Sequence, residues 1–198
     1  MQRMKYPLNS ARIALSILFI SFVFFLLPVY AQQKGEVKKE GLEVKAGQLA
    51  PLFALRNLEG NYISLKNYCG AEDTKVPAVL RKEKYIVIID FFSTICIPCI
   101  EALPALHRIY EKYKDKGLKM FLVNIDPKPE EVLPKFIKEN NIAIPVLLDM
   151  YSKTLEKYGF ESVPHTVLID KNRKILAVFK EEKDIEKKLD EKLSQILK

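Results

Sequence analysis

Cys96 and Cys99, two cysteines separated by two residues, are the side chains of this sequence best suited to chemistry. We expect Cys96 to stand at a helix N-terminus, where unpaired backbone N–H groups and the helix dipole favour a thiolate. A thiol in such a position can have its pKa lowered from about 8.5 into the range of roughly 3.5 to 7.5. Cys99 would lie in the first helical turn, near enough to close an intramolecular disulfide. The spacing predicts thiol–disulfide exchange, in which Cys96 attacks and Cys99 resolves the mixed disulfide.

The segments on either side of the pair would position the two thiols. Residues 86–89 form a continuous β-branched apolar run, which is typical of a central strand buried on both faces. Beyond Cys99 the apolar spacing becomes helical, and Gly117 supplies a helix stop. Pro98 suits an early helical position, because the N–H that it lacks would be unpaired there. The apolar residues on the expected helix face are Leu103, Leu106, Tyr110 and Tyr113.

Zinc binding and a purely structural disulfide are the alternatives for this spacing. A zinc site normally needs two more Cys or His ligands, often as a second close pair. The remaining candidates, Cys69, His107 and His165, are far apart in the sequence. The sequence therefore favours a redox-active Cys96–Cys99 disulfide, with no bound metal and no separate cofactor.

The strand, the C-x-x-C pair and the helix resemble the active-site segment of the thioredoxin superfamily, especially its exported TlpA/ResA/DsbE-like branch. Asp90 stands six residues before Cys96, where thioredoxins carry a buried acid. The resemblance implies that Asp90 relays a proton to or from Cys99. Burial supports this role, because a carboxyl group desolvated at the end of a buried strand has its pKa raised toward neutral. The alternative is an aspartate that merely ends the strand at a turn.

The segment also departs from its relatives. They usually carry Trp at the positions of Phe92 and Ile95, and this chain has no Trp. TlpA-like proteins often place a Glu three residues after the second cysteine, where this chain has Ala102. Glu101 comes one residue too early to inherit that role, since adjacent helical positions differ by about 100°. We expect the sulfur chemistry to be retained and the recognition of partners to differ.

A second functional signal lies at Val163, Pro164 and His165. The resemblance implies that Pro164 is a cis-proline that faces the disulfide and precedes a strand, although an ordinary trans-proline would also fit. A cis X–Pro bond exposes the backbone groups of the preceding residue, which can pair with an extended substrate. His165 either contacts the substrate or tunes the cysteine pair, or is only a surface or hydrogen-bonded residue. The expected substrate-binding residues are Val163, Pro164, His165, Ile97 and Pro98.

The remaining segments complete a thioredoxin-like α/β fold over residues 46–198. Residues 47–55 resemble the G-x-x-A-P-x-F-x-L opening that TlpA-like proteins share with peroxiredoxins, and with residues 62–65 they predict a β-hairpin. Residues 118–125 predict a parallel strand and residues 174–179 an antiparallel one. The C-terminal amphipathic helix predicts a cover for the sheet, with a membrane-surface helix as the alternative. The expected architecture is a central mixed sheet flanked by helices, with an N-terminal hairpin extension.

Residues 1–31 are expected to direct export. Three basic residues precede an apolar run at 13–27, and a small residue, Ala31, offers a cleavage site. The segment is either a cleaved signal peptide or an uncleaved N-terminal membrane anchor, and residues 32–45 follow as a polar linker. We therefore expect an extracytoplasmic domain, periplasmic or anchored to the membrane and facing outward.

Charge and the third cysteine add less information. Of the net charge of +7, three positive charges lie in residues 1–31, and Lys and Glu are interspersed in the rest of the chain. This distribution predicts no nucleic-acid partner.

Residues 71–84 are interpreted as an insertion loop near the active-site face. Cys69, just before it, is either a partner thiol or, as we favour, a small buried hydrophobic residue.

The resemblance implies an exported thiol–disulfide oxidoreductase that acts on protein disulfides. The uncharged Ile97-Pro98 dipeptide favours a reductase, with apocytochrome c as the expected client and a membrane thiol protein as the electron donor. Three alternatives remain at this point. They are a peroxiredoxin-like peroxidase, because Ser93 lies three residues before Cys96, a Sco-like copper-binding module using His165, and a partner-docking domain.

Overall fold

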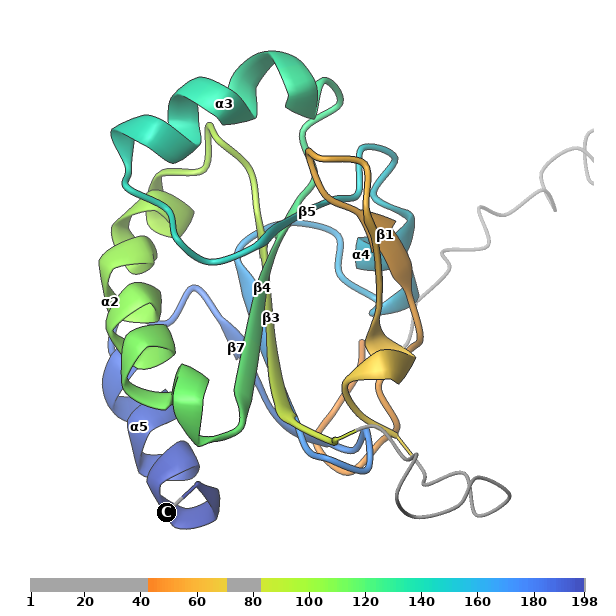
Figure 1. Cartoon of the computed structure of the whole chain (residues 1–198), viewed down its shortest axis with the longest axis vertical. Coiled ribbons are helices and arrows are strands. Elements are labelled where there is room, and N and C mark those ends of the chain that lie inside the picture. The colour runs from red at the N-terminus through yellow and green to blue at the C-terminus, as the bar shows by residue number, and fades with distance from the viewer. Residues whose placement is uncertain (1–42, 71–82, 198) are drawn as a thin grey trace, which may run out of the picture. The chain divides into compact units, whose positions relative to one another are not determined.

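The apolar run at residues 86–89 belongs to β3 (Ile86–Phe92), in which every residue is buried. The computed structural model describes residues 43–70 and 83–197 (Figure 1). β3 pairs in parallel with β4 (Leu118–Asn124) and antiparallel with β6 (His165–Ile169). The strand thus has a hydrogen-bonded neighbour on each side, which confirms its predicted central position.

Within the described residues the sheet has the strand order β2-β1-β5-β4-β3-β6-β7. β5 (Val146–Leu148) is parallel to β4, and β7 (Ile175–Lys180) is antiparallel to β6. The predicted N-terminal hairpin is formed by β1 (Ala54–Arg56) and β2 (Tyr62–Ser64), and it joins the sheet through β5. The architecture is the thioredoxin-like α/β fold that the sequence predicts, a central mixed sheet with an N-terminal hairpin.

Helices cover the two faces of this sheet (Figure 1). The helices are α2 (Ile97–Tyr113), α3 (Pro129–Glu139), α4 (Lys153–Lys157) and α5 (Ile185–Ile196), with 3-10 turns at Leu65–Asn67 and Lys114–Lys116. Buried residues of α2, α3 and α5 pack with Ile86, Ile88 and Phe92 of β3. Residues of α4 and the N-terminal segment pack with Val87, Ile89 and Phe91. β3 therefore contributes alternate side chains to both apolar clusters, as strand geometry requires.

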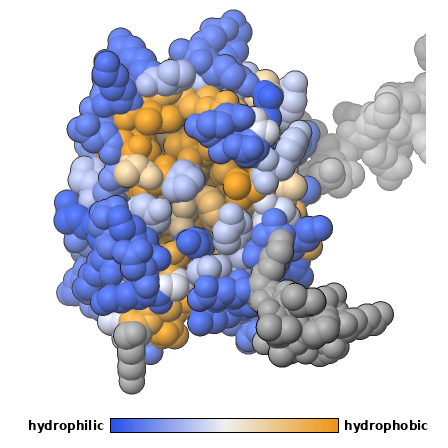
Figure 2. Space-filling model, in the orientation of Figure 1, coloured by the Kyte–Doolittle hydropathy of each residue, from blue (hydrophilic) through white to orange (hydrophobic). Residues whose placement is uncertain are grey.

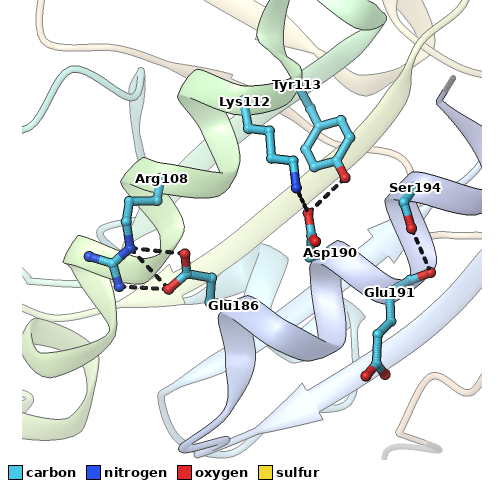
Figure 3. Close-up of polar contacts among 7 residues, drawn as sticks. All are labelled: Arg108, Lys112, Tyr113, Glu186, Asp190, Glu191 and Ser194. Atoms are coloured by element: carbon cyan, nitrogen blue, oxygen red, sulfur yellow. Dashed lines mark hydrogen bonds and ion pairs between the residues drawn. The ribbon is translucent and has the colours of Figure 1, made fainter.

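The predicted packing of the C-terminal helix is confirmed by contacts between α5 and α2. Arg108 donates two hydrogen bonds from Nε, 2.9 and 3.0 Å long, to the carboxylate of Glu186 (Figure 3). One turn further on, Asp190 accepts from Lys112 at 2.5 Å and from the Tyr113 hydroxyl at 2.7 Å. These exposed pairs add specificity rather than much stability, because water screens them. The buried residues of α5, Ile185, Leu189 and Leu193, supply the larger hydrophobic term.

Apolar residues are exposed on the side of the molecule that faces the viewer in Figure 1. Figure 2 shows this surface in the middle of the view, bordered by hydrophilic residues. A cavity of about 280 Å³ lies where β4 meets the hairpin side of the sheet, and its lining includes Tyr68, Phe121 and Leu147. Tyr68 contacts Phe121 edge-on, with their ring centroids 5.1 Å apart. The cavity is thus mainly apolar.

Several predictions from the sequence lie outside the described residues. These are the leader at residues 1–31, most of the linker at 32–45 and most of the insertion at 71–84. Val44, from the end of the predicted linker, is buried, and its N–H donates to Tyr158 O at 3.0 Å. The flanks of the insertion, at Gly70 and Tyr85, lie at the start of β3, whereas Cys96 follows its other end. None of the helices in the described part of the chain has the length and apolar composition needed to cross a membrane.

Candidate active site

The cysteine pair forms a disulfide across the first turn of α2. Cys96 is the N-cap of the helix, with extended backbone angles, and Cys99 lies one turn later. The two sulfur atoms are bonded, with the two Cα atoms 5.2 Å apart. Cys96 is half-buried, whereas Cys99 is only 1% exposed. The backbone N–H of Cys99 donates to Cys96 Sγ at 3.3 Å. The geometry makes Cys96 the sulfur that a client can reach, and it keeps Cys99 behind it.

Asp90 lies inside β3 rather than at a turn, and its side chain is 2% exposed. It is the register partner of Thr166 in β6, and Thr166 Oγ1 donates a hydrogen bond to Asp90 Oδ1 at 2.6 Å. Burial raises the pKa of Asp90 to about 7, and the hydrogen bond from Thr166 partly opposes this shift. The predicted direction of the shift is confirmed. A carboxyl group with this pKa can give or take a proton at neutral pH.

The Val163–Pro164 peptide bond is cis, as the resemblance implies. Pro164 precedes β6 and lines a cavity of about 320 Å³ together with Asp90 and Pro98. Thr166 and Glu101 contribute to the same cavity. The structure therefore brings together the first turn of α2, the buried acid and the prolyl turn, and Asp90 is hydrogen-bonded to Thr166, which lies 76 residues away in the sequence.

Apolar side chains stand exposed around the reactive sulfur. Ile95 is 86% exposed and Ile97 is 68% exposed, on the two sides of Cys96. Pro98 is half-buried and faces the cavity, and Val163 is half-buried against both apolar clusters. Exposed apolar residues beside a reactive group are typical of a surface that binds a partner. Ile95 is not among the substrate-binding residues expected from the sequence, but it is exposed beside Cys96 as Ile97 is.

His165 does not lie with these residues. Its imidazole is 2% exposed and stacks on Phe160, with their ring centroids 4.0 Å apart. Nδ1 lies 2.9 Å from Ser162 O, and burial lowers the pKa of the imidazole. His165 is paired with Phe91 in the sheet, so its side chain points to the face opposite Asp90. The expected contact between the His165 side chain and a substrate is thus corrected: the residue supports the core beside the prolyl turn.

Asp126, a second buried carboxylate that lies just after β4, is not singled out in the sequence analysis. It accepts hydrogen bonds from the Ser93 hydroxyl, from Thr94 N at 3.0 Å and from Asn124 Nδ2 at 2.9 Å. Burial alone would raise the pKa of Asp126, but these hydrogen bonds outweigh it and hold the pKa below its ordinary value. Asp126 therefore stays ionised and ties the turn before Cys96 to the end of β4.

The same contacts bear on the alternative functions. Ser93, the residue that suggested a peroxidase, donates its hydroxyl to Asp126, so it is engaged away from the sulfur of Cys96. His165, the suggested copper ligand, points to the other face of the sheet. The contacts of Ser93 therefore do not support a peroxidase site, and those of His165 do not support a copper site.

Cys69 is a free thiol and is buried, 1% exposed. Burial raises the pKa of this thiol to about 11. Its sulfur lies 3.8 Å from Leu65 O, within an apolar cluster. A thiol that is neutral and enclosed is a poor nucleophile. The structure supports the interpretation of Cys69 as a small buried hydrophobic residue.

Comparison with known proteins gives concordant similarities. Residues 46–178 match the model of the AhpC/TSA family. The chain is 30% identical over 159 residues to thiol-disulfide oxidoreductase ResA of Bacillus thuringiensis subsp. konkukian, which covers 80% of this chain and 82% of the relative. It is also 30% identical over 136 residues to ResA of Geobacillus thermodenitrificans, covering 69% of this chain and 70% of that relative. A solved DsbE-type thiol:disulfide interchange protein from Chlorobium tepidum is similar with a TM-score of 0.65 and 26% identity, covering 78% and 99% of the two chains.

Proposed function

Because the chain belongs to the AhpC/TSA family and is a ResA- and DsbE-like thiol–disulfide oxidoreductase of the thioredoxin superfamily, we propose that it reduces disulfides in exported client proteins. The observation that carries this proposal is the meeting of three groups. One cavity is lined by Pro98, which lies between the two bonded cysteines in the first turn of α2, by the buried Asp90 and by cis-Pro164.

The reaction would begin from the reduced dithiol. The thiolate of Cys96 attacks one sulfur of the client disulfide, forming a mixed disulfide and releasing the other client sulfur. Asp90 takes the proton of the Cys99 thiol, and the Cys99 thiolate then attacks Cys96 Sγ. The Cys96–Cys99 bond forms, the bond to the client breaks, and the client leaves with both cysteines reduced. Two electrons pass from the enzyme to the client in this cycle.

Client binding would use the exposed groups around Cys96. The backbone at Val163 and Pro164 can pair with an extended segment of the client, as an added strand does. Ile95 and Ile97 offer apolar contacts on both sides of the sulfur that is attacked. The disulfide is the only redox group that this chemistry needs, so the proposal involves no separate cofactor.

The finer assignment rests on the resemblance drawn from the sequence. We assign apocytochrome c, before haem attachment, as the client and a membrane thiol protein as the electron donor. Residues 1–31 would place the domain outside the cytoplasm, either as a cleaved signal peptide or as a membrane anchor. The uncharged Ile97-Pro98 dipeptide between the cysteines favours reduction over oxidation of clients.

The proposal is tested by trapping clients in cells with Cys99→Ala. This variant retains Cys96 but lacks the resolving thiol, so mixed disulfides with clients should accumulate on non-reducing gels. Cys99→Ala combined with Cys96→Ala is the matched control and should trap nothing. Cys99→Ala combined with Cys69→Ala should trap as much as Cys99→Ala alone, because Cys69 is buried.

Two results would count against the proposal. One is the absence of any client trapped through Cys96 in cells where the wild type is active. The other is a reduction potential near about −120 mV, which is typical of a strong oxidant and would reverse the direction of electron flow. Recovery of an apocytochrome c among the trapped clients would support the finer assignment.

A further inference from the structure

The hydrogen bond between Thr166 and Asp90 has a consequence for the reaction proposed above. Thr166 Oγ1 donates to Asp90 Oδ1 at 2.6 Å, and the two residues are direct register partners in β6 and β3. Both side chains are buried, 5% and 2% exposed. Rigid neighbouring strands therefore fix the distance between donor and acceptor, so the bond holds the carboxyl group in one orientation.

The second carboxyl oxygen of Asp90 is differently placed. Among the described residues, the hydrogen bond to Asp90 goes to Oδ1, and Oδ2 accepts none. Oδ2 is nevertheless not a buried atom without a partner; in the described part of the chain, His107 Nε2 is the side-chain atom of that kind. Asp90 and Thr166 both line the cavity that Pro98 and Pro164 share. Thr166 thus occupies one oxygen and leaves the other open to this cavity.

We propose that Thr166 is a positioning residue for proton transfer, which holds Asp90 so that Oδ2 exchanges the proton of Cys99. The inference rests on the proposed function, in which the Asp90 carboxylate accepts that proton before the Cys99 thiolate attacks Cys96. Cys99 is buried in the cluster that contains Ile88 and Phe92, the neighbours of Asp90 on the same face of β3. In the step, the sulfur–sulfur bond between Cys96 and the client breaks, the Cys96–Cys99 bond forms, and the departing client sulfur takes a proton from Asp90 or water.

The hydroxyl of Thr166 should also set the pH at which Asp90 works. A donor to a carboxylate stabilises the ionised form, so loss of this bond should raise the pKa of Asp90 above about 7. The other charged groups that line the cavity are Glu101 of α2 and Glu181, Glu182 and Lys183, which follow β7. Glu182 is paired with Lys188. None of them makes a direct hydrogen bond to Asp90 in the described part of the chain, so Thr166 is the group to vary.

The test compares Thr166→Val with Thr166→Ser in a single-turnover assay of client release across pH 5 to 9. Valine keeps the shape of threonine and removes the donor, whereas serine keeps the donor. We expect Thr166→Val to move the midpoint of the pH profile upward by about one unit. At pH 7 its rate should fall at least fivefold, because fewer molecules hold an ionised Asp90 and its carboxylate is no longer held in one orientation. Thr166→Ser should keep the wild-type midpoint of the pH profile. In both variants, KM for the client should not change.

A double-variant comparison separates positioning from a general loss of structure. Asp90→Asn removes the proton acceptor, so Thr166→Val added to Asp90→Asn should cause no further loss. Thr154, a second buried threonine, lies in α4, and Thr154→Val should leave the midpoint unchanged. A Thr166→Val profile with the wild-type midpoint, or one lowered equally at every pH, would overturn the inference. A wild type that releases no reduced client would instead overturn the proposed function.

Discussion

Asp90 and Asp126 are both buried carboxyl groups beside the start of α2, but their pKa values are shifted in opposite directions. Asp90 accepts one hydrogen bond, and burial raises its pKa to about 7. Asp126 accepts hydrogen bonds from two side chains and one backbone N–H, which outweigh burial and lower its pKa. Two acids with separated pKa values can divide their roles. Asp90 is suited to carry protons, and Asp126 is suited to anchor the active-site turn as a fixed charge.

The raised pKa of Asp90 predicts a pH-dependent loss of stability in the oxidised protein. An unfolded Asp ionises near pH 3.8, whereas native Asp90 ionises near 7, so the native state binds more protons between these values. Stability should therefore fall as pH rises from about 4 to 7. Asp90→Asn should remove this dependence and make the protein more stable at pH 8 by up to about 4 kcal/mol. Urea unfolding of the oxidised forms at pH 4.5 and pH 8 measures both effects; equal differences at the two pH values would contradict the prediction.

Asp126→Ala should destabilise the protein and loosen the turn before Cys96. The substitution leaves the Ser93 hydroxyl, Thr94 N–H and Asn124 amide without their acceptor, and we expect a loss of about 2 to 4 kcal/mol. The folded pKa of Asp126 is depressed, so the stabilisation it gives is present above about pH 4 and is lost as pH falls below that. Denaturation at pH 7 measures the loss. Asp115→Ala, at an exposed site, is the control and should change stability by less than about 0.5 kcal/mol.

Cys69 should react with a thiol reagent only when the protein unfolds. Its side chain is enclosed, and burial raises its pKa to about 11, so both access and thiolate content are low. With the oxidised protein, a chromogenic disulfide reagent at pH 8 should detect no thiol without denaturant and one thiol in concentrated urea. Rapid labelling of the native protein would show that Cys69 is accessible and would reopen its interpretation as a partner thiol.

Docking of α5 onto α2 should depend on apolar burial more than on the ion pairs of Figure 3. Leu189 is fully buried, so Leu189→Ala should cost about 2 to 5 kcal/mol. Arg108→Gln removes an exposed pair with Glu186, and its effect should be hard to resolve, because solvent screens the interaction. The free energies of unfolding of both variants, measured by chemical denaturation, show whether apolar burial or the ion pair contributes more. A larger loss for Arg108→Gln than for Leu189→Ala would contradict the prediction.

Local patterns in the sequence were sufficient for the elements that carry the site. The β-branched run predicted β3, the change to helical spacing predicted α2, and a turn between alternating apolar residues predicted the hairpin. Each of these signals depends on residues close together in the chain. The cis bond before Pro164 came from resemblance, because a sequence alone does not distinguish the two isomers.

Contacts between distant residues could not be predicted in the same way. Asp126 meets Ser93 across 33 residues, and its acidic turn sequence alone shows no reason for burial. His165 was placed with the substrate residues because it follows Pro164. Its face of the sheet is determined only by the register that sets Thr166 opposite Asp90. The alternation of side chains along a strand could have predicted this, because His165 and Thr166 are neighbours and cannot both face the disulfide.

The pKa of Asp90, near neutral, would make the rate of an exported enzyme depend on the pH of the medium. Cells regulate the acidity of their interior closely but have little control over the medium beyond the membrane. An exported enzyme with this acid would exchange sulfur bonds more slowly as that medium turned acidic, because a growing share of molecules would hold Asp90 in its protonated form. The supply of reduced clients would then follow environmental acidity without any dedicated sensor protein.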